Sequence, residues 1–139
     1  MATLIRPEIS EKNKYWIDKH RHYELKHFCL QYPEWKRAYA SCNDMCSSTI
    51  GIERISTNNA PGDPTAKRAI MRAYYAQRIK MVERIAAETD NCLHDYILKA
   101  VTEGWSYTYL KTRLGIPCGR DMYYERYRRF FWLLSQARD

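Results

Sequence analysis

The chain contains little glycine and proline, and it has no long apolar run. Five residues of each type among 139 are too few for a loop-rich, all-β or collagen-like protein. No window approaches the roughly 18 apolar residues of a membrane span, and the first ten residues hold no apolar segment typical of a signal peptide. We therefore expect an α-rich, soluble protein with no membrane partner.

Recognisable catalytic motifs are also missing. The sequence has no glycine-rich phosphate loop, no HExxH motif and no paired acidic motif. Cys92 and His94 are two residues apart, so on a helix they point to different sides and cannot act as a nucleophile and its base. The five cysteines form an odd set without dense spacing, as expected for reduced intracellular thiols. We expect no enzymatic activity, no catalytic residue and no cofactor.

A zinc site is an alternative use of the cysteines. Cys42 and Cys46 are four residues apart, and a second ligand pair would have to come from a nearby group. That group is His20, His22, His27 and Cys29. Zinc needs four converging ligands, usually from two short pairs, and pairs two apart diverge on a helix. Core or surface roles are therefore favoured, and we expect no metal.

Positive charge is concentrated near the C-terminus. The formal net charge is +7. Residues 105–139 carry 7 basic and 3 acidic side chains, whereas residues 1–47 carry 8 and 6, and residues 48–104 carry 8 and 7. A local basic excess favours polyanions, because binding releases counterions from nucleic acid. A basic charge that serves only solubility would be expected to be spread evenly along the chain, and this charge is not.

Helical periodicity dominates the first third of the chain. Apolar residues recur over residues 11–31, and Tyr32-Pro33 should end that helix and start another. We take residues 1–46 as an N-terminal helical segment. Residues 47–64, SSTIGIERISTNNAPGDP, are rich in turn formers and predict a linker or loop.

Aromatic residues are frequent in the same third. They are Tyr15, Trp16, Tyr23, Trp35 and Tyr39. Such a stripe usually forms a helical core, but these residue types are also enriched at partner surfaces.

A long central helix is predicted over residues 65–90, with Asp63 as its cap and Pro64 in its first turn. Its apolar stripe has the spacing of one helix face. The stripe contains Met71, Tyr75, Ile79, Val82 and Ala86. A helix this long packs against several others or against its own copy, so a homodimer is one expectation.

Residues 91–139 predict a helix-turn-helix domain. A helix over 91–103 should end at Gly104, and Ser106 can cap a short helix over 107–114. The predicted inward residues of that short helix are Tyr107, Leu110 and Leu114. A tight turn, Gly115–Gly119, carries one apolar residue, and a final helix follows over 120–136. Its expected apolar face contains Tyr123, Tyr127, Phe130, Phe131 and Leu134.

This arrangement suits DNA binding because the turn sets two helices at a steep angle. The N-terminal half of the second helix then enters the major groove. Its predicted DNA-facing residues are Arg120, Asp121, Tyr124, Glu125 and Arg128. Lys111 and Arg113 are predicted to contact the backbone, and Arg126 and Arg129 to flank the duplex. An ordinary helical hairpin with a solvated basic face is the alternative.

The string YLKTRLGIPCGRDMYYERYRRFFWLL (109–134) resembles the helix-turn-helix of sigma-factor region 4, although its turn has one extra residue. Together with KNKYWIDKHRHYELKHFCLQYPEWK (12–36), it is similar to small phage and prophage proteins of the RinA/ArpU type. This resemblance implies an all-α transcriptional regulator that activates late or packaging genes in the cytoplasm of a bacterial host cell. Its partners would be double-stranded DNA and RNA polymerase.

Two other functions remain open at this stage. A phage-encoded inhibitor could use its basic, aromatic surface to block a host nucleoprotein complex. A small terminase subunit of a DNA-packaging machine would also join a helix-turn-helix to oligomerising helices. The first would bind a host protein without preferring its own upstream DNA, and the second would form large rings.

Overall fold

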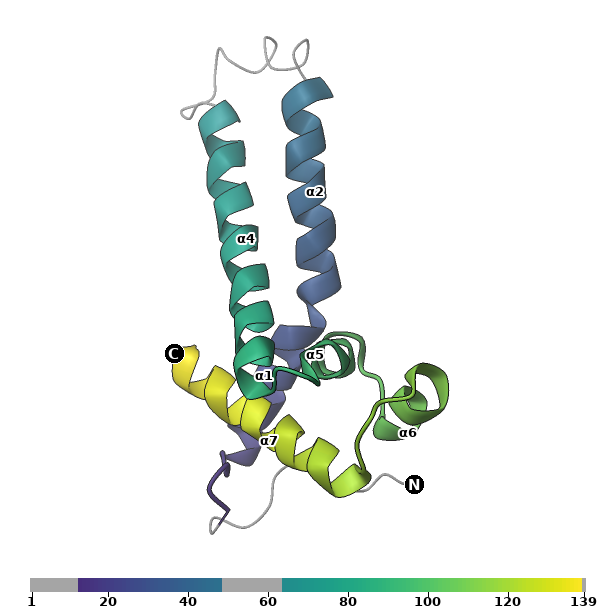
Figure 1. The fold of residues 1–139 in the computed structure, drawn as a ribbon. Coiled ribbons are helices and arrows are strands. Elements are labelled where there is room, and N and C mark those ends of the chain that lie inside the picture. The colour runs from purple at the N-terminus through teal and green to yellow at the C-terminus, as the bar shows by residue number, and fades with distance from the viewer. Residues whose placement is uncertain (1–12, 49–63, 139) are drawn as a thin grey trace. The chain divides into compact units, whose positions relative to one another are not determined.

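The computed structural model describes residues 13–48 and 64–138, with side chains for 13–42 and 64–138. All regular elements in these residues are helices, which confirms the predicted all-α class. Figure 1 shows them in chain order. They are α1 (Lys19–Leu30), α2 (Tyr32–Ser48), α4 (Pro64–Thr89), α5 (His94–Glu103), α6 (Tyr107–Tyr109), the π-helical η1 (Leu110–Leu114) and α7 (Arg120–Ala137).

The chain divides into two compact units. One contains residues 1–31 and 81–139, and the other contains residues 32–80. These limits differ from the predicted segments, because the first unit joins α1 to the last turns of α4 and to the C-terminal helices. The helix-turn-helix therefore belongs to a unit that also contains part of the N-terminal third.

The first helix is shorter than predicted. Residues 13–18 are not helical, and α1 begins only at Lys19. Asp18 has an extended backbone and its carboxylate accepts a hydrogen bond from the His20 N–H at 3.0 Å. A side-chain acceptor at this position satisfies one of the four N–H groups that a helix start leaves unpaired. The cap therefore sets the start, and the prediction of a helix from Glu11 was wrong over residues 13–18.

The predicted linker is wrong at its N-terminal end, because Ser47 and Ser48 still belong to α2. At the other end Pro64 begins α4, as its predicted place in the first turn of the central helix requires. Pro64 fits there because a first-turn residue needs no N–H donor. The remainder of the predicted loop and the Asp63 cap lie outside the described residues.

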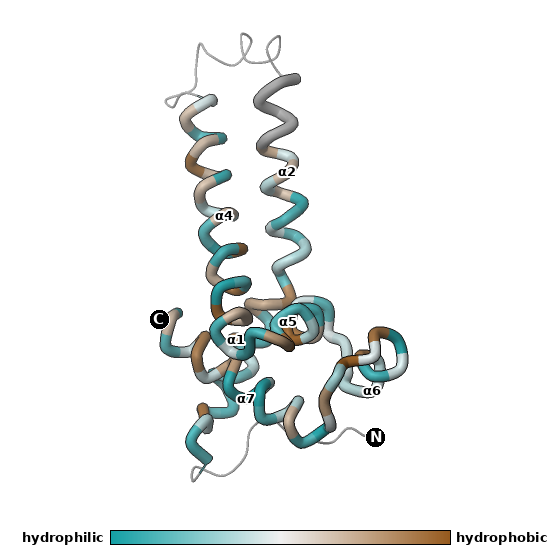
Figure 2. The backbone as a smooth tube through the Cα atoms, in the orientation of Figure 1, coloured by the Kyte–Doolittle hydropathy of each residue, from teal (hydrophilic) through white to brown (hydrophobic). Residues whose placement is uncertain are grey.

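Helix α4 confirms the predicted long central helix, and Figure 2 shows hydrophobic and hydrophilic residues alternating along it. Its apolar stripe is only partly buried. Val82 and Ala86, which belong to the first unit, are at most 1% exposed, whereas Met71 in the second unit is 38% exposed. In that second unit the Arg78 guanidinium lies 4.1 Å from the centroid of the exposed Tyr74 ring.

The N-terminal aromatic residues differ in burial, and the partner-surface role stays a prediction. Only Trp35 is buried, in the first turns of α2, where its ring meets that of Tyr32 at a centroid distance of 6.5 Å. Tyr23 is 41% exposed. The half-buried members are Tyr15, Trp16 and Tyr39.

Helix α5 also starts later than predicted, at His94 instead of Asn91. The Asp90 carboxylate accepts hydrogen bonds from the N–H groups of Cys92 and Leu93, at 2.8 and 2.9 Å. This local turn competes with the helix and keeps residues 91–93 outside it. At the other end, Gly104 has a left-handed backbone (φ 75°) and its N–H donates to Ala100 O, as a helix-ending glycine should.

The core of the first unit is formed by α1, α5, α7 and the last turns of α4. Helix α1 packs against α5 and α7, and α5 packs against α7. Fully buried residues come from each of these helices. They include Leu25, Cys29, Val82, Ile85, Ile97, Phe130, Phe131 and Leu134. The helix-turn-helix is thus supported by a common core.

Candidate nucleic-acid interface

The first helix of the motif is α6 continued by η1. Ser106 caps it, because its hydroxyl accepts a hydrogen bond from the Tyr109 N–H at 3.2 Å, as predicted. Tyr107 and Leu110 are buried, also as predicted. Leu114 was predicted to point inward, but it is 39% exposed. The last turn is π-helical, and this wider turn rotates Leu114 away from its α-helical position.

The turn between the two helices is held by several hydrogen bonds. Gly115 has φ 65°, a left-handed conformation that glycine adopts without steric cost, and its N–H donates to Leu110 O and Lys111 O. The Tyr107 hydroxyl donates to Cys118 O at 2.8 Å, and Lys111 Nζ donates to Ile116 O at 3.3 Å. Both bonds fasten the turn to the first helix.

Ile116 is the apolar residue of this turn, and it is fully buried. Its position agrees with the prediction that one apolar side chain packs beneath the turn. The five-residue turn is therefore anchored at its centre, which fixes the angle between η1 and α7.

The inner face of α7 is the predicted one. Tyr123, Phe130, Phe131 and Leu134 are at most 1% exposed, while Tyr127 is half-buried. His22 of α1 packs edge-on against Phe131 at a centroid distance of 4.8 Å. Helix α7 is therefore fixed in its rotation, and this determines which residues it presents to solvent.

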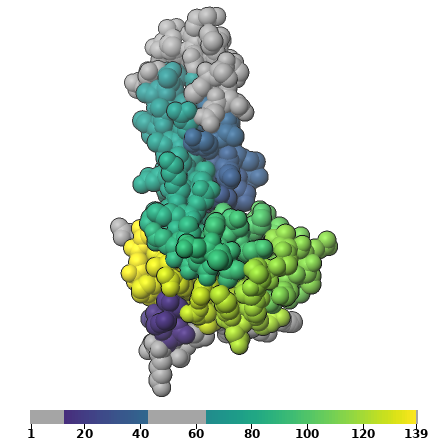
Figure 3. All heavy atoms as spheres, viewed as in Figure 1, coloured from purple at the N-terminus to yellow at the C-terminus, as the bar shows by residue number. Residues whose placement is uncertain are grey.

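The N-terminal end of α7 is exposed. Arg120 and Asp121 are exposed, and Tyr124 and Glu125 are half-buried. The Arg120 guanidinium lies 5.0 Å from the centroid of the Tyr107 ring, so a cation–π contact holds it above the turn. Figure 3 shows this end of α7 on the molecular surface, beside the green atoms of the first helix.

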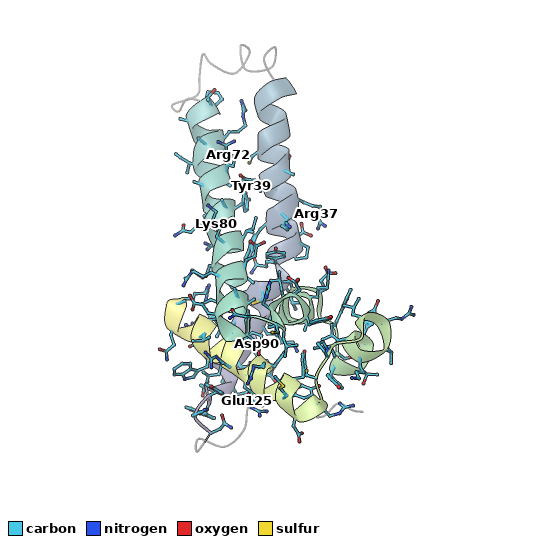
Figure 4. The ribbon with its side chains drawn as sticks, in the orientation of Figure 1. Arg37, Tyr39, Arg72, Lys80, Asp90 and Glu125 are labelled. Carbon is cyan, nitrogen blue, oxygen red and sulfur yellow. The ribbon has the colours of Figure 1, made fainter. Side chains whose placement is uncertain are left out.

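Arg126, which was predicted to flank a duplex, is engaged in ion pairs within the protein. Its Nε donates to Asp90 Oδ2 at 2.7 Å, and its Nη1 pairs with Glu125. Figure 4 labels Asp90 at the end of α4 and Glu125 on α7. Because Asp90 also caps the turn before α5, one carboxylate joins the α4–α5 corner to α7. The contact spans 36 positions in the sequence, and no local pattern indicated it.

Arg128 and Arg129 are both half-buried. Arg129 Nη2 donates to the Glu88 carbonyl oxygen at 3.5 Å, which directs it toward α4. The Nε atoms of both arginines are buried without a hydrogen-bond partner among the described residues. Arg128 is therefore the better of the two for contacting a ligand beside Tyr124.

The structure separates the two cations predicted on the first helix. The Lys111 ammonium group donates a hydrogen bond to Ile116 O in the turn, whereas the Arg113 guanidinium lies 5.8 Å from the centroid of the Tyr109 ring. Residues two apart on a helix point to different sides. Lys111 and Arg120 are thus both tied to the turn, and Arg113 belongs to another part of the surface.

The contact of Asp90 with Arg126 makes the stability of the protein depend on pH. Burial raises the pKa of this carboxyl, but hydrogen bonds from Arg126, Leu93 and Cys92 outweigh burial and hold its pKa below the usual value. A depressed folded-state pKa stabilises the fold above the unfolded pKa of about 3.9, and this stability is lost as the pH falls through the lower folded value.

Asp90→Asn should therefore lower the free energy of unfolding by about 1–2 kcal/mol at neutral pH. Asparagine keeps an acceptor for the local turn but removes the charge opposite Arg126. The difference between wild type and variant should shrink as thermal unfolding is followed downward from about pH 5. Glu103→Gln, an exposed carboxylate on α5, is the matched control and should show no such difference. Equal stability of Asp90→Asn and wild type at pH 7 would contradict this role.

The described residues contain no group of three or more His, Cys, Asp or Glu side chains placed to hold a metal ion. The side chain of Cys46, one of the two cysteines considered as zinc ligands, is not among the side chains that the structure describes. The His94 ring contacts Asn91 O and Asp95 Oδ1, at 2.9 and 3.3 Å.

No helix in the described ranges combines the length and the hydropathy needed to cross a membrane.

Comparisons with protein-family models, with curated proteins and with solved structures found no match to this chain.

Proposed function

We propose that the helix-turn-helix formed by α6, η1 and α7 binds double-stranded DNA and reads its sequence with the N-terminal end of α7. One observation carries this proposal: α7 begins with an exposed arginine, Arg120, held above a rigid turn. Residues 104–120 also contain no acidic side chain and include Lys111, Arg113 and Arg120. A segment without carboxylates that leads into an exposed helix end suits a phosphate backbone flanking a groove.

The polar residues of α7 have chemically distinct roles in the proposed complex. Arg120 and Arg128 can bind guanine O6 and N7 in the major groove. Asp121 and Glu125 can accept hydrogen bonds from cytosine N4, and Tyr124 can donate to a phosphate. Lys111 supplies a backbone contact at the turn. Arg129 is a weaker candidate because it already donates to Glu88 O.

The biological role follows from the resemblance to RinA/ArpU-type regulators. In this proposal the protein activates late genes of a phage or prophage in the cytoplasm of a bacterial host, binds promoter DNA and contacts RNA polymerase. A homodimer would place two such motifs on adjacent half-sites about one helical turn apart.

Selection from a pool of random-sequence duplexes tests the proposal. Wild-type protein should enrich one sequence motif over successive rounds, and light scattering should show a monomer or dimer. Failure to enrich any motif would contradict sequence-specific binding and would favour an inhibitor of a host complex. A large ring in light scattering would contradict the regulator and favour a packaging component.

A further inference from the structure

Two cations and two aromatic rings form a continuous row on the surface of the first unit. Lys99 Nζ lies 5.6 Å from the centroid of the Trp105 ring, and the Trp105 and Tyr109 rings meet edge to face at 4.5 Å. Arg113 then lies 5.8 Å from the Tyr109 centroid. We call these four residues the Trp105 row. It connects the exposed side of α5 with the solvent face of α6 and η1.

Most of the exposed residues of the first helix are hydrogen-bond donors. Tyr107 and Leu110 point into the core; besides Lys111 and Leu114, the exposed positions are 108, 109, 112 and 113. They are Thr, Tyr, Thr and Arg, all residue types that contact phosphate oxygens in DNA complexes. Lys99 is exposed beside them, and Trp105 is half-buried with Tyr109 37% exposed. The cation–π contacts hold both cations in defined positions.

We infer that the Trp105 row binds phosphates of the DNA backbone at a second place, apart from the turn that carries Lys111 and Arg120. This inference rests on the proposed function, because it concerns the same duplex. Charge complementarity favours a polyanion at Arg113, since residues 104–120 contain no carboxylate, whereas Lys99 lies on α5 with Asp95 and Glu103 four residues away on either side. In helix-turn-helix proteins the first helix crosses the backbone while the second enters the groove; Tyr109 and Arg113 lie on that first helix, and Trp105 connects them to Lys99 of α5.

The salt dependence of binding measures this contact directly. The double variant Lys99→Ala/Arg113→Ala should bind the duplex selected by wild-type protein about tenfold more weakly. The slope of log affinity against log salt should become shallower by about 2, because each phosphate contact contributes about 0.9. Base preference within the motif should not change, since backbone contacts carry no sequence information.

Two controls make the result specific. Lys26→Ala/Arg37→Ala removes the same two residue types from exposed positions on α1 and α2, and it should keep the wild-type slope. Lys99→Arg/Arg113→Lys preserves both charges and should also keep that slope. Circular dichroism establishes that each variant is folded. If the alanine variant does not fold, Lys99→Gln/Arg113→Gln takes its place, because it removes both charges but keeps long side chains, and it should show the same shallower slope.

A wild-type slope in folded Lys99→Ala/Arg113→Ala would overturn the inference. If that variant keeps the wild-type slope while wild-type protein still selects one sequence motif, the proposed function stands. The Trp105 row would then be assigned to an acidic protein partner. Absence of duplex selection by wild type would refute the proposed function itself. An equally shallow slope in Lys99→Arg/Arg113→Lys would contradict an electrostatic contact, because this variant keeps both positive charges.

Discussion

Replacing both Arg120 and Arg128 with alanine is expected to remove sequence-specific DNA binding. Each bidentate arginine–guanine contact contributes about 1–3 kcal/mol of discrimination against the wrong base. Losing both should weaken binding to the selected duplex by about a hundredfold or more, since 1.4 kcal/mol corresponds to tenfold. Binding to random-sequence DNA should fall much less, because Lys111 and Arg113 remain.

The two arginines differ in their surroundings, and single variants use that difference. Arg120 is exposed, so Arg120→Ala should keep the stability of wild type while losing specificity. Arg128 is half-buried, and its truncation also removes packing. Arg120→Lys should behave like Arg120→Ala in base preference, because lysine keeps the charge but not the planar pair of donors.

Gel-shift titration against the selected and a scrambled duplex measures this effect. The matched control is Arg37→Ala/Arg84→Ala, which removes two arginines from exposed ion pairs with Glu34 and Glu88. Such surface pairs contribute little to stability. The control should bind like wild type. Equal preference of Arg120→Ala/Arg128→Ala and wild type for the selected duplex would show that the end of α7 does not read the bases.

Truncating Ile116 should cause the largest loss of stability among the residues of the turn. Its side chain is fully buried in the turn, and replacing a buried Ile by Ala typically lowers the free energy of unfolding by about 2–5 kcal/mol. For a chain of 139 residues, each kcal/mol corresponds to roughly 3–5 °C in Tm. Ile116→Ala should thus unfold well below wild type. Specific binding should weaken even where the variant is folded, because the angle between η1 and α7 is less firmly set.

Two neighbouring substitutions calibrate that result. Ile116→Val removes one methyl group and should lower the free energy of unfolding by only about 0.5–1.5 kcal/mol. Leu114→Ala removes a side chain of similar size that is 39% exposed, and its effect should be smaller than that of Ile116→Ala. Thermal unfolding followed by circular dichroism gives all three values. If Leu114→Ala were the more destabilising of the two alanine variants, Ile116 would not be the anchor of the turn.

Features set by local sequence were predictable in this protein. The end of α5 at Gly104, the Ser106 cap and the buried face of α7 follow from glycine conformation, capping chemistry and helical period. The starts of two helices were predicted too early. Asp18 caps α1 and Asp90 closes a turn before α5, so each of these helices begins later than apolar spacing alone indicated.

The candidate site was predictable in composition but not in arrangement. The turn residues and the exposed Arg120 were visible in the sequence. The separation of Lys111 from Arg113 follows from their spacing of two residues on a helix, but their partners, Ile116 O and the Tyr109 ring, were not visible in the sequence. Arg126 appeared free to flank DNA because its partner, Asp90, is distant in the sequence. The only sequence signal for the Trp105 row was the lack of acidic residues between Glu103 and Asp121.

Methylation interference on the selected duplex tests most directly whether α7 reads the major groove. Guanine N7 lies in the major groove and adenine N3 in the minor groove, and dimethyl sulfate modifies both. Methylation at guanine N7 within the motif should block binding of wild-type protein, and at one guanine the interference should disappear in Arg120→Ala. Interference confined to adenine N3, or the same pattern in wild type and Arg120→Ala, would contradict reading of the groove by Arg120 and the N-terminal end of α7.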